Sequence, residues 1–213
     1  MLLITRPRYD TATHYLYHWT KEIIDEADTR GIDYKVLNKD EVKKKVIQSY
    51  LKKGIAHTLL INGHGSATTV CGHEDKVLIS STDGVQHLKG VVIFARACKA
   101  AQILGPKAIE KGARAFIGYI EDFIFLHQSD KESEFFKDPT KDNLAKPFME
   151  CSNKVSQALI KGHSPSDAHE QSQKLYRKYM REMLNSEAES YALPYLLANM
   201  QNQVCLESAQ EDI

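Results

Sequence analysis

The feature that most constrains the fold is a regular alternation of short apolar runs with segments of helical periodicity. The apolar runs are typical of buried strands and lie at residues 1–5, 33–37, 57–62, 91–95 and 115–119. Between them, apolar residues recur at helical spacing over residues 13–30, 40–53 and 106–111, and a glycine follows each segment. Strands that alternate with helices form parallel βαβ units. The sequence therefore predicts an α/β fold: a three-layer α/β/α sandwich with a mostly parallel central sheet.

Other segments depart from this rhythm. Residues 70–84, VCGHEDKVLISSTDG, predict a small hairpin or flap instead of a helix. Residues 127–143 are polar and predict an exposed loop, while residues 144–213 are mostly helical in pattern. A chain of 213 residues suits one domain. We therefore expect a single domain over residues 1–213, with a core at about 1–125, the exposed loop and a C-terminal helical tail.

The charge balance and the cysteine positions limit which classes of binding partner and which cellular compartment are expected. Lysine plus arginine number 28, and aspartate plus glutamate also number 28, so no overall field favours nucleic acid or an anionic membrane as a partner. No apolar run approaches the length of a membrane span, and the N-terminus lacks the pattern of a secretory leader. The four cysteines show no paired spacing, which argues against a disulfide framework. We expect a cytoplasmic protein.

Two reactive side chains follow neighbouring apolar runs at the points where those runs end. The run that ends at Asn62 leads through Gly63 to His64 and Gly65, and the next run leads to Cys98. If the two strands are neighbours in a parallel sheet, His64 and Cys98 face one crevice at its carboxyl edge. An imidazole beside a cysteine can activate the thiol as a nucleophile. The backbone N–H groups of Gly65 and Cys98 could then stabilise an oxyanion.

This order of elements resembles the caspase-like cysteine peptidases of clan CD, a group that includes caspases, gingipains, clostripain, separase and CHAT domains. The segment Arg96-Ala97-Cys98-Lys99 is similar to the caspase motif Gln-Ala-Cys followed by Arg, Gln or Gly, although its first position differs. The interval from His64 to Cys98 is shorter than the roughly 50 residues typical of caspases. The NGHG segment at 62–65 and the Gly-Tyr pair at 118–119 look closer to the prokaryotic gingipain-like and CHAT branch. The resemblance covers about residues 1–125.

The resemblance implies a cysteine endopeptidase that cleaves proteins or peptides. Cys98 would be the nucleophile, and His64 would be the general acid/base that protonates the leaving amine. No cofactor is expected. Members of the group often act as gated effectors in bacterial defence, including antiviral defence, or in cell death, so an activating small molecule or partner protein is a further expectation. The alternative is a catalytically silent caspase-like module that only binds a partner.

The sequence does not determine whether the substrate pocket is acidic or basic. Six charged residues near the predicted strand ends could line it: Arg6, Arg8, Asp10, Arg96, Glu121 and Asp122. By the resemblance, the arginines would form a basic pocket for an acidic side chain. The carboxylates could instead form an acidic pocket for arginine or lysine, as in gingipain-like relatives. For any one of these residues taken alone, a surface charge is the simpler interpretation.

A metal site is disfavoured. Cys71 and His73 lie close in sequence, with His64 and His87 on either side. Their spacing fits none of the common zinc frameworks, which need four well-placed ligands. We therefore expect no metal, and a flap that carries an incidental thiol.

Overall fold

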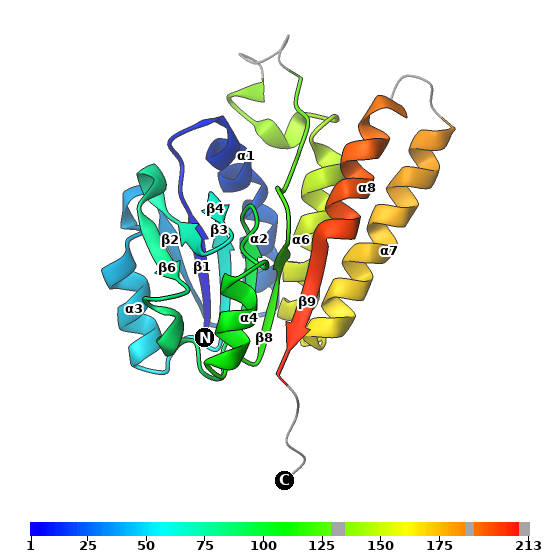
Figure 1. The fold of residues 1–213 in the computed structure, drawn as a ribbon. Coiled ribbons are helices and arrows are strands. Elements are labelled where there is room, and N and C mark those ends of the chain that lie inside the picture. The colour runs from blue at the N-terminus through cyan, green and yellow to red at the C-terminus, as the bar shows by residue number, and fades with distance from the viewer. Residues whose placement is uncertain (129–134, 186–189, 209–213) are drawn as a thin grey trace.

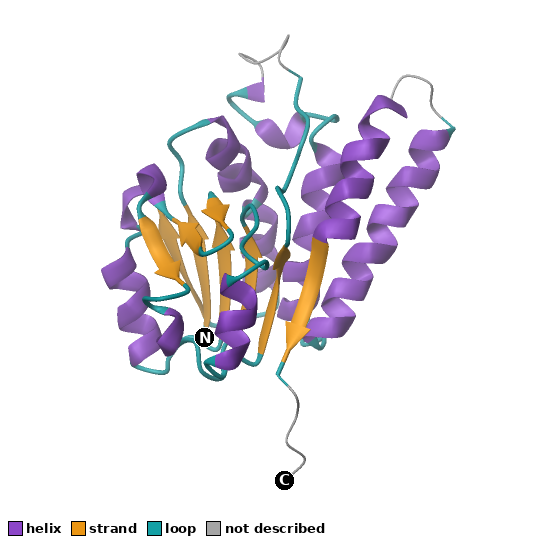
Figure 2. Ribbon diagram, in the orientation of Figure 1, coloured by secondary structure: helices purple, strands orange, loops and turns teal. Residues whose placement is uncertain are grey.

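The computed structural model describes residues 1–128, 135–185 and 190–208, and a six-stranded sheet forms its centre (Figures 1 and 2). In spatial order the strands are β2 (Tyr34–Asn38), β1 (Leu2–Arg6), β3 (Thr58–Asn62), β7 (Val92–Arg96), β8 (Ala115–Tyr119) and β9 (Gln203–Glu207). The first five are parallel, and β9 runs antiparallel to β8. The predicted mostly parallel sheet is thus confirmed.

Helices cover both faces of this sheet, as the alternation of strand side chains requires. In β3, Leu59 and Ile61 pack with α3 (Lys44–Lys52) and α4 (Leu104–Glu110) on one face. Leu60 between them packs on the other face, in a cluster with residues of three helices: α2 (Lys21–Thr29), α6 (Lys146–Ile160) and α7 (Pro165–Leu184). The three-layer sandwich is therefore confirmed.

The first helical segment is shorter and more broken than its periodicity predicts. Residues 13–30 form two helices, α1 (Thr11–Trp19) and α2, which meet at Thr20. At this junction Thr20 Oγ1 donates a hydrogen bond to the Leu16 carbonyl oxygen at 2.6 Å, a contact that often bends helices and that hydrophobic periodicity does not register.

The next two helical segments also begin at other residues than their periodicity predicts. Residues 40–53 divide into a short 3₁₀ turn, η1 (Lys39–Glu41), followed by α3. The helix predicted over residues 106–111 begins slightly earlier, at Leu104, and the residues between Cys98 and Leu104 form turns. Cys98 therefore does not lie at a helix N-terminus.

A small antiparallel sheet stands beside the carboxyl edge of the main sheet. Its strands are β4 (Gly65–Ser66), β5 (Thr69–Cys71) and β6 (Val77–Ser80), with 3₁₀ turns η2 (His73–Asp75) and η3 (Val85–His87). This confirms the hairpin or flap predicted over 70–84 and extends it back to the residue after His64. We call residues 65–80 the flap.

The C-terminal part departs from a purely helical tail. After α6 and α7, the 3₁₀ turn η6 (Ser190–Ala192) and α8 (Leu193–Asn202) lead into β9, which pairs with β8 over Ala115–Tyr119. None of the helices in the described ranges combines the length and the apolar character that crossing a bilayer requires. The tail is thus integrated into the sheet and supplies its last strand (Figure 1).

The expectation of an exposed loop at 127–143 is only partly testable, because residues 129–134 lie outside the described residues. From Phe135 onward the segment contacts α1, while Phe136, Lys137, Lys141 and Asn143 are exposed. The Trp19 indole N–H donates to the carbonyl oxygen of Pro139, which opens the 3₁₀ turn η5 (Pro139–Lys141). Tyr15 donates from its hydroxyl to the fully buried Asp142 carboxylate at 2.7 Å.

Candidate active site

The two strands that lead to His64 and Cys98 are direct neighbours. β3 and β7 pair in parallel register from Thr58 with Val92 to Asn62 with Arg96. Each reactive residue lies two positions beyond the end of its strand, so the register alone brings them to one point of the carboxyl edge. The juxtaposition predicted from the sequence is confirmed.

Gly65 shows how closely the two chain segments approach. A Cβ atom at Gly65 would lie 2.8 Å from the Cys98 carbonyl oxygen and 2.9 Å from Ala97 Cβ. Both distances are shorter than a van der Waals contact, so only glycine permits this approach. The glycine after His64 is therefore explained by contact with the Cys98 segment.

Cys98 and His64 share one small cleft with a volume of about 80 Å³. Its lining residues come from α1, from the ends of β3 and β7, and from the segment after β8: Ala12, Thr13, Leu16, Gly63, His64, Arg96, Ala97, Cys98, Phe123 and Phe125. Most of this surface is apolar, and the cleft brings together a thiol and an imidazole.

The backbone turns sharply directly after the thiol. Lys99 has φ of 58°, in the left-handed region that non-glycine residues seldom adopt. Its N–H donates to the Glu121 carbonyl oxygen at 3.0 Å, which holds this conformation in place. Backbone strain of this kind concentrates at functional sites.

Asp10, predicted from the sequence as a pocket charge, lies beside His64. Its Oδ2 lies 2.6 Å from His64 Nε2, and the two side chains are equally exposed, at 39%. The carboxylate also caps α1, since Oδ1 accepts a hydrogen bond from the Thr13 N–H at 2.8 Å. Burial alone raises the pKa of Asp10, but the Thr13 and His64 hydrogen bonds outweigh it and lower that pKa overall. Asp10 therefore contacts the imidazole instead of lining the cleft as a substrate charge.

With Nε2 held by a carboxylate, the imidazole is fixed in orientation. A neutral His64 would donate from Nε2–H to Asp10 and leave the lone pair of Nδ1 available. The sequence signal for this role is faint: an Asp-x-x-Thr capping pattern directly after the first strand.

Tyr9 joins this region to the flap. Its ring meets the His64 ring edge-on, with centroids 6.1 Å apart, and meets the His73 ring in the same way at 5.3 Å. Its hydroxyl donates to Asp75 Oδ1 at 2.6 Å. Tyr9 thereby connects the loop before α1 to the flap, next to the His64 imidazole.

The surroundings of Cys98 disfavour the thiolate. The half-buried sulfur donates a long contact of 4.0 Å to the Phe123 carbonyl oxygen. Burial raises the pKa of the thiol, and the negative charge of Asp122 raises it further, while Lys99 opposes this shift. Within the described ranges no hydrogen bond joins Cys98 Sγ to His64, so no thiolate–imidazolium pair is formed here.

Arg96, proposed from the sequence as a pocket charge, is instead a structural cation. Its side chain is 2% exposed, and burial lowers its pKa to about 10. Nε donates to Asn62 Oδ1, Nη1 to Asn153 Oδ1 and to Met149 Sδ, and Nη2 to Asn62 Oδ1 and Thr20 Oγ1. The guanidinium thus uses all five donors within the protein. These donors are therefore not free to bind a substrate carboxylate.

The other arginines also have protein partners or lie outside the cleft. Arg6 donates from Nε and Nη2 to the Tyr17 carbonyl oxygen and covers the Tyr17 ring at 3.9 Å. The Arg8 guanidinium lies 5.4 Å from the same ring. Neither lines the cleft described above.

The two acidic residues after β8 are exposed and lie at the rim. Lys99 Nζ is 4.0 Å from Glu121 Oε2 and 3.6 Å from Asp122 Oδ1. Neither carboxylate lines the cleft. Asp122 and Lys99 nevertheless lie near enough to Cys98 to shift the pKa of its thiol.

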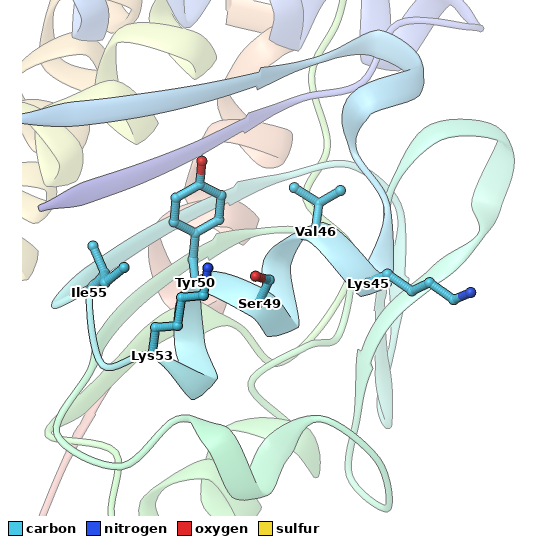
Figure 3. A pocket seen from close by; sticks show the side chains of 6 residues that line it. All are labelled: Lys45, Val46, Ser49, Tyr50, Lys53 and Ile55. Atoms are coloured by element: carbon cyan, nitrogen blue, oxygen red, sulfur yellow. The ribbon is translucent and has the colours of Figure 1, made fainter.

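A second hollow, about 420 Å³ in volume, lies along α3 (Figure 3). Its lining comes from α3 and the turn that follows: Lys45, Val46, Ser49, Tyr50, Lys53 and Ile55. Tyr50 points from the helix toward the sheet in this view. Neither a thiol nor an imidazole lines this hollow, so we place the candidate active site at Cys98 and His64.

No family model and no curated protein matches the sequence. Among solved structures, the Arg-specific cysteine proteinase gingipain R (RGPB) aligns with a TM-score of 0.58 and 15% identity, over 97% of this chain and 45% of that one. The complex of Porphyromonas gingivalis RgpB pro- and mature domains gives 0.59 and 14%, over 98% of this chain and 47% of that one. The chain thus spans less than half the length of these neighbours. The likeness shows that this chain shares the caspase-like α/β fold of these structures.

Proposed function

We propose that the protein is a cysteine endopeptidase in which Cys98 is the nucleophile and His64 the general acid/base. The observation that carries the proposal is the shared cleft: Cys98 and His64 line it together, and a carboxylate holds His64. A thiol, an imidazole and an orienting carboxylate are the groups that nucleophilic acyl transfer needs. The clan CD fold of the gingipain structures supports the same chemistry.

The proposed reaction runs through a thioester. His64 accepts the thiol proton, the sulfur attacks the peptide carbonyl carbon, and the N–H groups of Cys98 and Gly65 stabilise the oxyanion. His64 then gives the proton to the leaving amine as the C–N bond breaks. Water attacks the resulting acyl-enzyme, which releases the carboxylic acid and restores the thiol. Asp10 serves as a positioning residue throughout by holding Nε2.

The test is a positional-scanning library of fluorogenic peptides, assayed with wild type, Cys98→Ala and His64→Ala. Both variants should lose cleavage by roughly 10³-fold or more, because each removes an essential member of the constellation. Cys71→Ala is the matched control, since it removes a half-buried flap thiol outside the cleft. Undiminished proteolysis in Cys98→Ala or His64→Ala would contradict the proposal.

One observation favours the alternative of a catalytically silent interaction module. The raised pKa of Cys98 leaves little thiolate at neutral pH. Alkylation rates separate the two cases. If the protein is a peptidase, a substrate-like electrophile that occupies the cleft should alkylate Cys98 faster than it alkylates Cys71, Cys151 or Cys205. Equal reactivity at all four positions would favour the binding module.

We further propose that the activity is gated, as in an effector of bacterial defence or cell death within the gingipain-like and CHAT branch. The raised pKa of the Cys98 thiol supports this, because a thiol with little thiolate reacts slowly until its surroundings change. The trigger would be a small molecule or a partner protein in the cytoplasm. Purified protein should then cleave its best peptide faster after addition of extract from stressed cells. Equal rates with and without extract would argue against gating.

A further inference from the structure

We infer that the substrate residue whose carbonyl is attacked carries a small or medium apolar side chain, of the size of valine or leucine. The inference rests on the proposed peptidase function and specifies its substrate class. Because Cys98 and His64 themselves line the cleft, a carbonyl carbon within reach of Sγ lies at its mouth. The side chain of that residue begins two bonds from the carbonyl carbon, so the cleft is the space that it enters.

One wall of the cleft is a face of α1. Ala12 and Leu16 are four positions apart, which places them on the same side of the helix. Leu16 is nearly fully buried and belongs to a cluster with Trp19 and Met149. This wall is therefore apolar and backed by the protein core.

Another part of the lining is aromatic and belongs to the same cluster as Leu16. Phe123 packs against the buried ring of Tyr119, with centroids 4.9 Å apart, and Phe125 packs against Tyr15 at 5.2 Å. The two phenylalanine rings lie 6.5 Å from each other. Both parts of the lining thus pack against further buried side chains, as in binding sites that are largely preformed.

The volume limits what can enter. The cleft has a volume of about 80 Å³, which is small beside the roughly 300–1,000 Å³ of sites that take drug-sized ligands. An isopropyl or isobutyl group has comparable bulk. A long chain tipped with a guanidinium would exceed this space.

The charges argue against the acidic and basic alternatives. An acidic substrate side chain would need a free cation, and all five Arg96 donors already have protein partners. A basic side chain would need a carboxylate, and none lines the cleft in the described ranges. Asp10 is occupied by His64 and Thr13. Either substrate charge would be buried here without a partner, which is costly.

The first test is a set of fluorogenic peptides that differ only at the residue before the cleaved bond. We expect kcat/KM for valine or leucine to exceed that for arginine, lysine or aspartate by tenfold or more. Cys98-dependent cleavage that prefers a charged residue overturns the inference and leaves the peptidase proposal standing. If no peptide is cleaved in a Cys98-dependent manner, the peptidase proposal itself fails, and the inference with it.

A substitution that fills the cleft provides the second test. Ala12→Leu adds three carbons from the α1 wall, and Ala12→Val adds two if the larger change disturbs folding. The ratio of kcat/KM for leucine over alanine peptides should fall at least tenfold in Ala12→Leu and less in Ala12→Val. Thr11→Leu, at an exposed position of α1 outside the cleft, is the matched control. An unchanged ratio in folded Ala12 variants would overturn the inference.

Discussion

At the scale of single residues, Asp10 combines two tasks that one substitution can separate. Asparagine caps a helix as well as aspartate does, so Asp10→Asn should keep the Thr13 contact and the thermal midpoint. It removes the negative charge that faces His64 Nε2. We expect kcat to fall by at least about tenfold with KM little changed, since general acid–base catalysis depends on this orientation. Steady-state kinetics and thermal unfolding on the same samples check this, and a parallel loss of stability and kcat would point to a merely structural role.

Asp122 offers a second prediction at this scale, because its charge raises the pKa of the Cys98 thiol. Asp122→Asn should lower that pKa and increase the thiolate fraction at neutral pH. Burial remains the larger cause, so the pKa should stay above the ordinary value. The pH dependence of Cys98 alkylation, followed by peptide mass mapping, measures the shift. Glu121→Gln is the matched control, because Glu121 is also exposed and near Lys99 but is not among the groups that shift Cys98.

The residues differ in how far the sequence could predict them. His64 and Cys98 could be found because each follows an apolar strand, and parallel strands end at one edge. The pairing of Asp10 with His64 depends on how the loop before α1 folds over the end of β3, which no local pattern encodes. The burial of Arg96 depends on Asn153, a residue of a distant helix. Because an arginine is seldom fully buried, its residue type alone predicts that Arg96 is exposed.

At the scale of elements, α1 and the segment from Phe135 to Asp142 form a contact that should respond to pH. Burial lowers the pKa of His18 to about 4, and the neighbouring His14, Arg8 and Arg6 lower it further, while Asp138 opposes them. The unfolded chain has an ordinary histidine pKa near 6.5 and so binds a proton more readily than the folded chain between these values. Acidification from pH 6.5 toward 4 should therefore lower the free energy of unfolding.

His18→Gln should weaken this pH dependence, because glutamine has no proton to bind in this range. Urea unfolding of both proteins at several pH values between 7.5 and 4.5 measures the difference in slope. His163→Gln serves as the matched control, since His163 is exposed in the turn between α6 and α7. An equal slope in wild type and His18→Gln would refute the assignment of this effect to His18.

Element boundaries were predictable where hydrophobic periodicity alone decides them, as for β8 at Ala115–Tyr119. Boundaries were missed where a side-chain contact or pairing with a distant strand sets the end of the element. The first helical segment divides at Thr20, whose hydroxyl donates to the Leu16 carbonyl oxygen. β9 is a half-buried segment after a helix, and only its pairing with β8 makes it a strand.

At the scale of the whole molecule, the tail and the sheet are joined by buried polar contacts. Asn153 of α6 accepts from Arg96 of β7 at 2.8 Å and donates to the Trp19 carbonyl oxygen at 2.9 Å. The hydroxyls of Tyr119 in β8 and Tyr176 in α7 lie 3.3 Å apart, and both rings are fully buried. Separation of the tail would leave Arg96 Nη1 and these hydroxyls without their partners, which is costly in an apolar interior.

We therefore expect residues 1–213 to unfold as one cooperative unit, which tests the single-domain organisation proposed from the sequence. Trp19 is the only tryptophan, so its fluorescence reports on α1, while far-UV circular dichroism is dominated by the long tail helices. The two urea transitions should coincide in wild type. Asn153→Ala leaves the buried Arg96 Nη1 without its amide partner and should lower the free energy of unfolding by about 1–3 kcal/mol. Both probes should shift together in this variant, because the contact joins the two parts; a fluorescence transition that stays in place while the dichroism transition moves would show that the tail unfolds on its own.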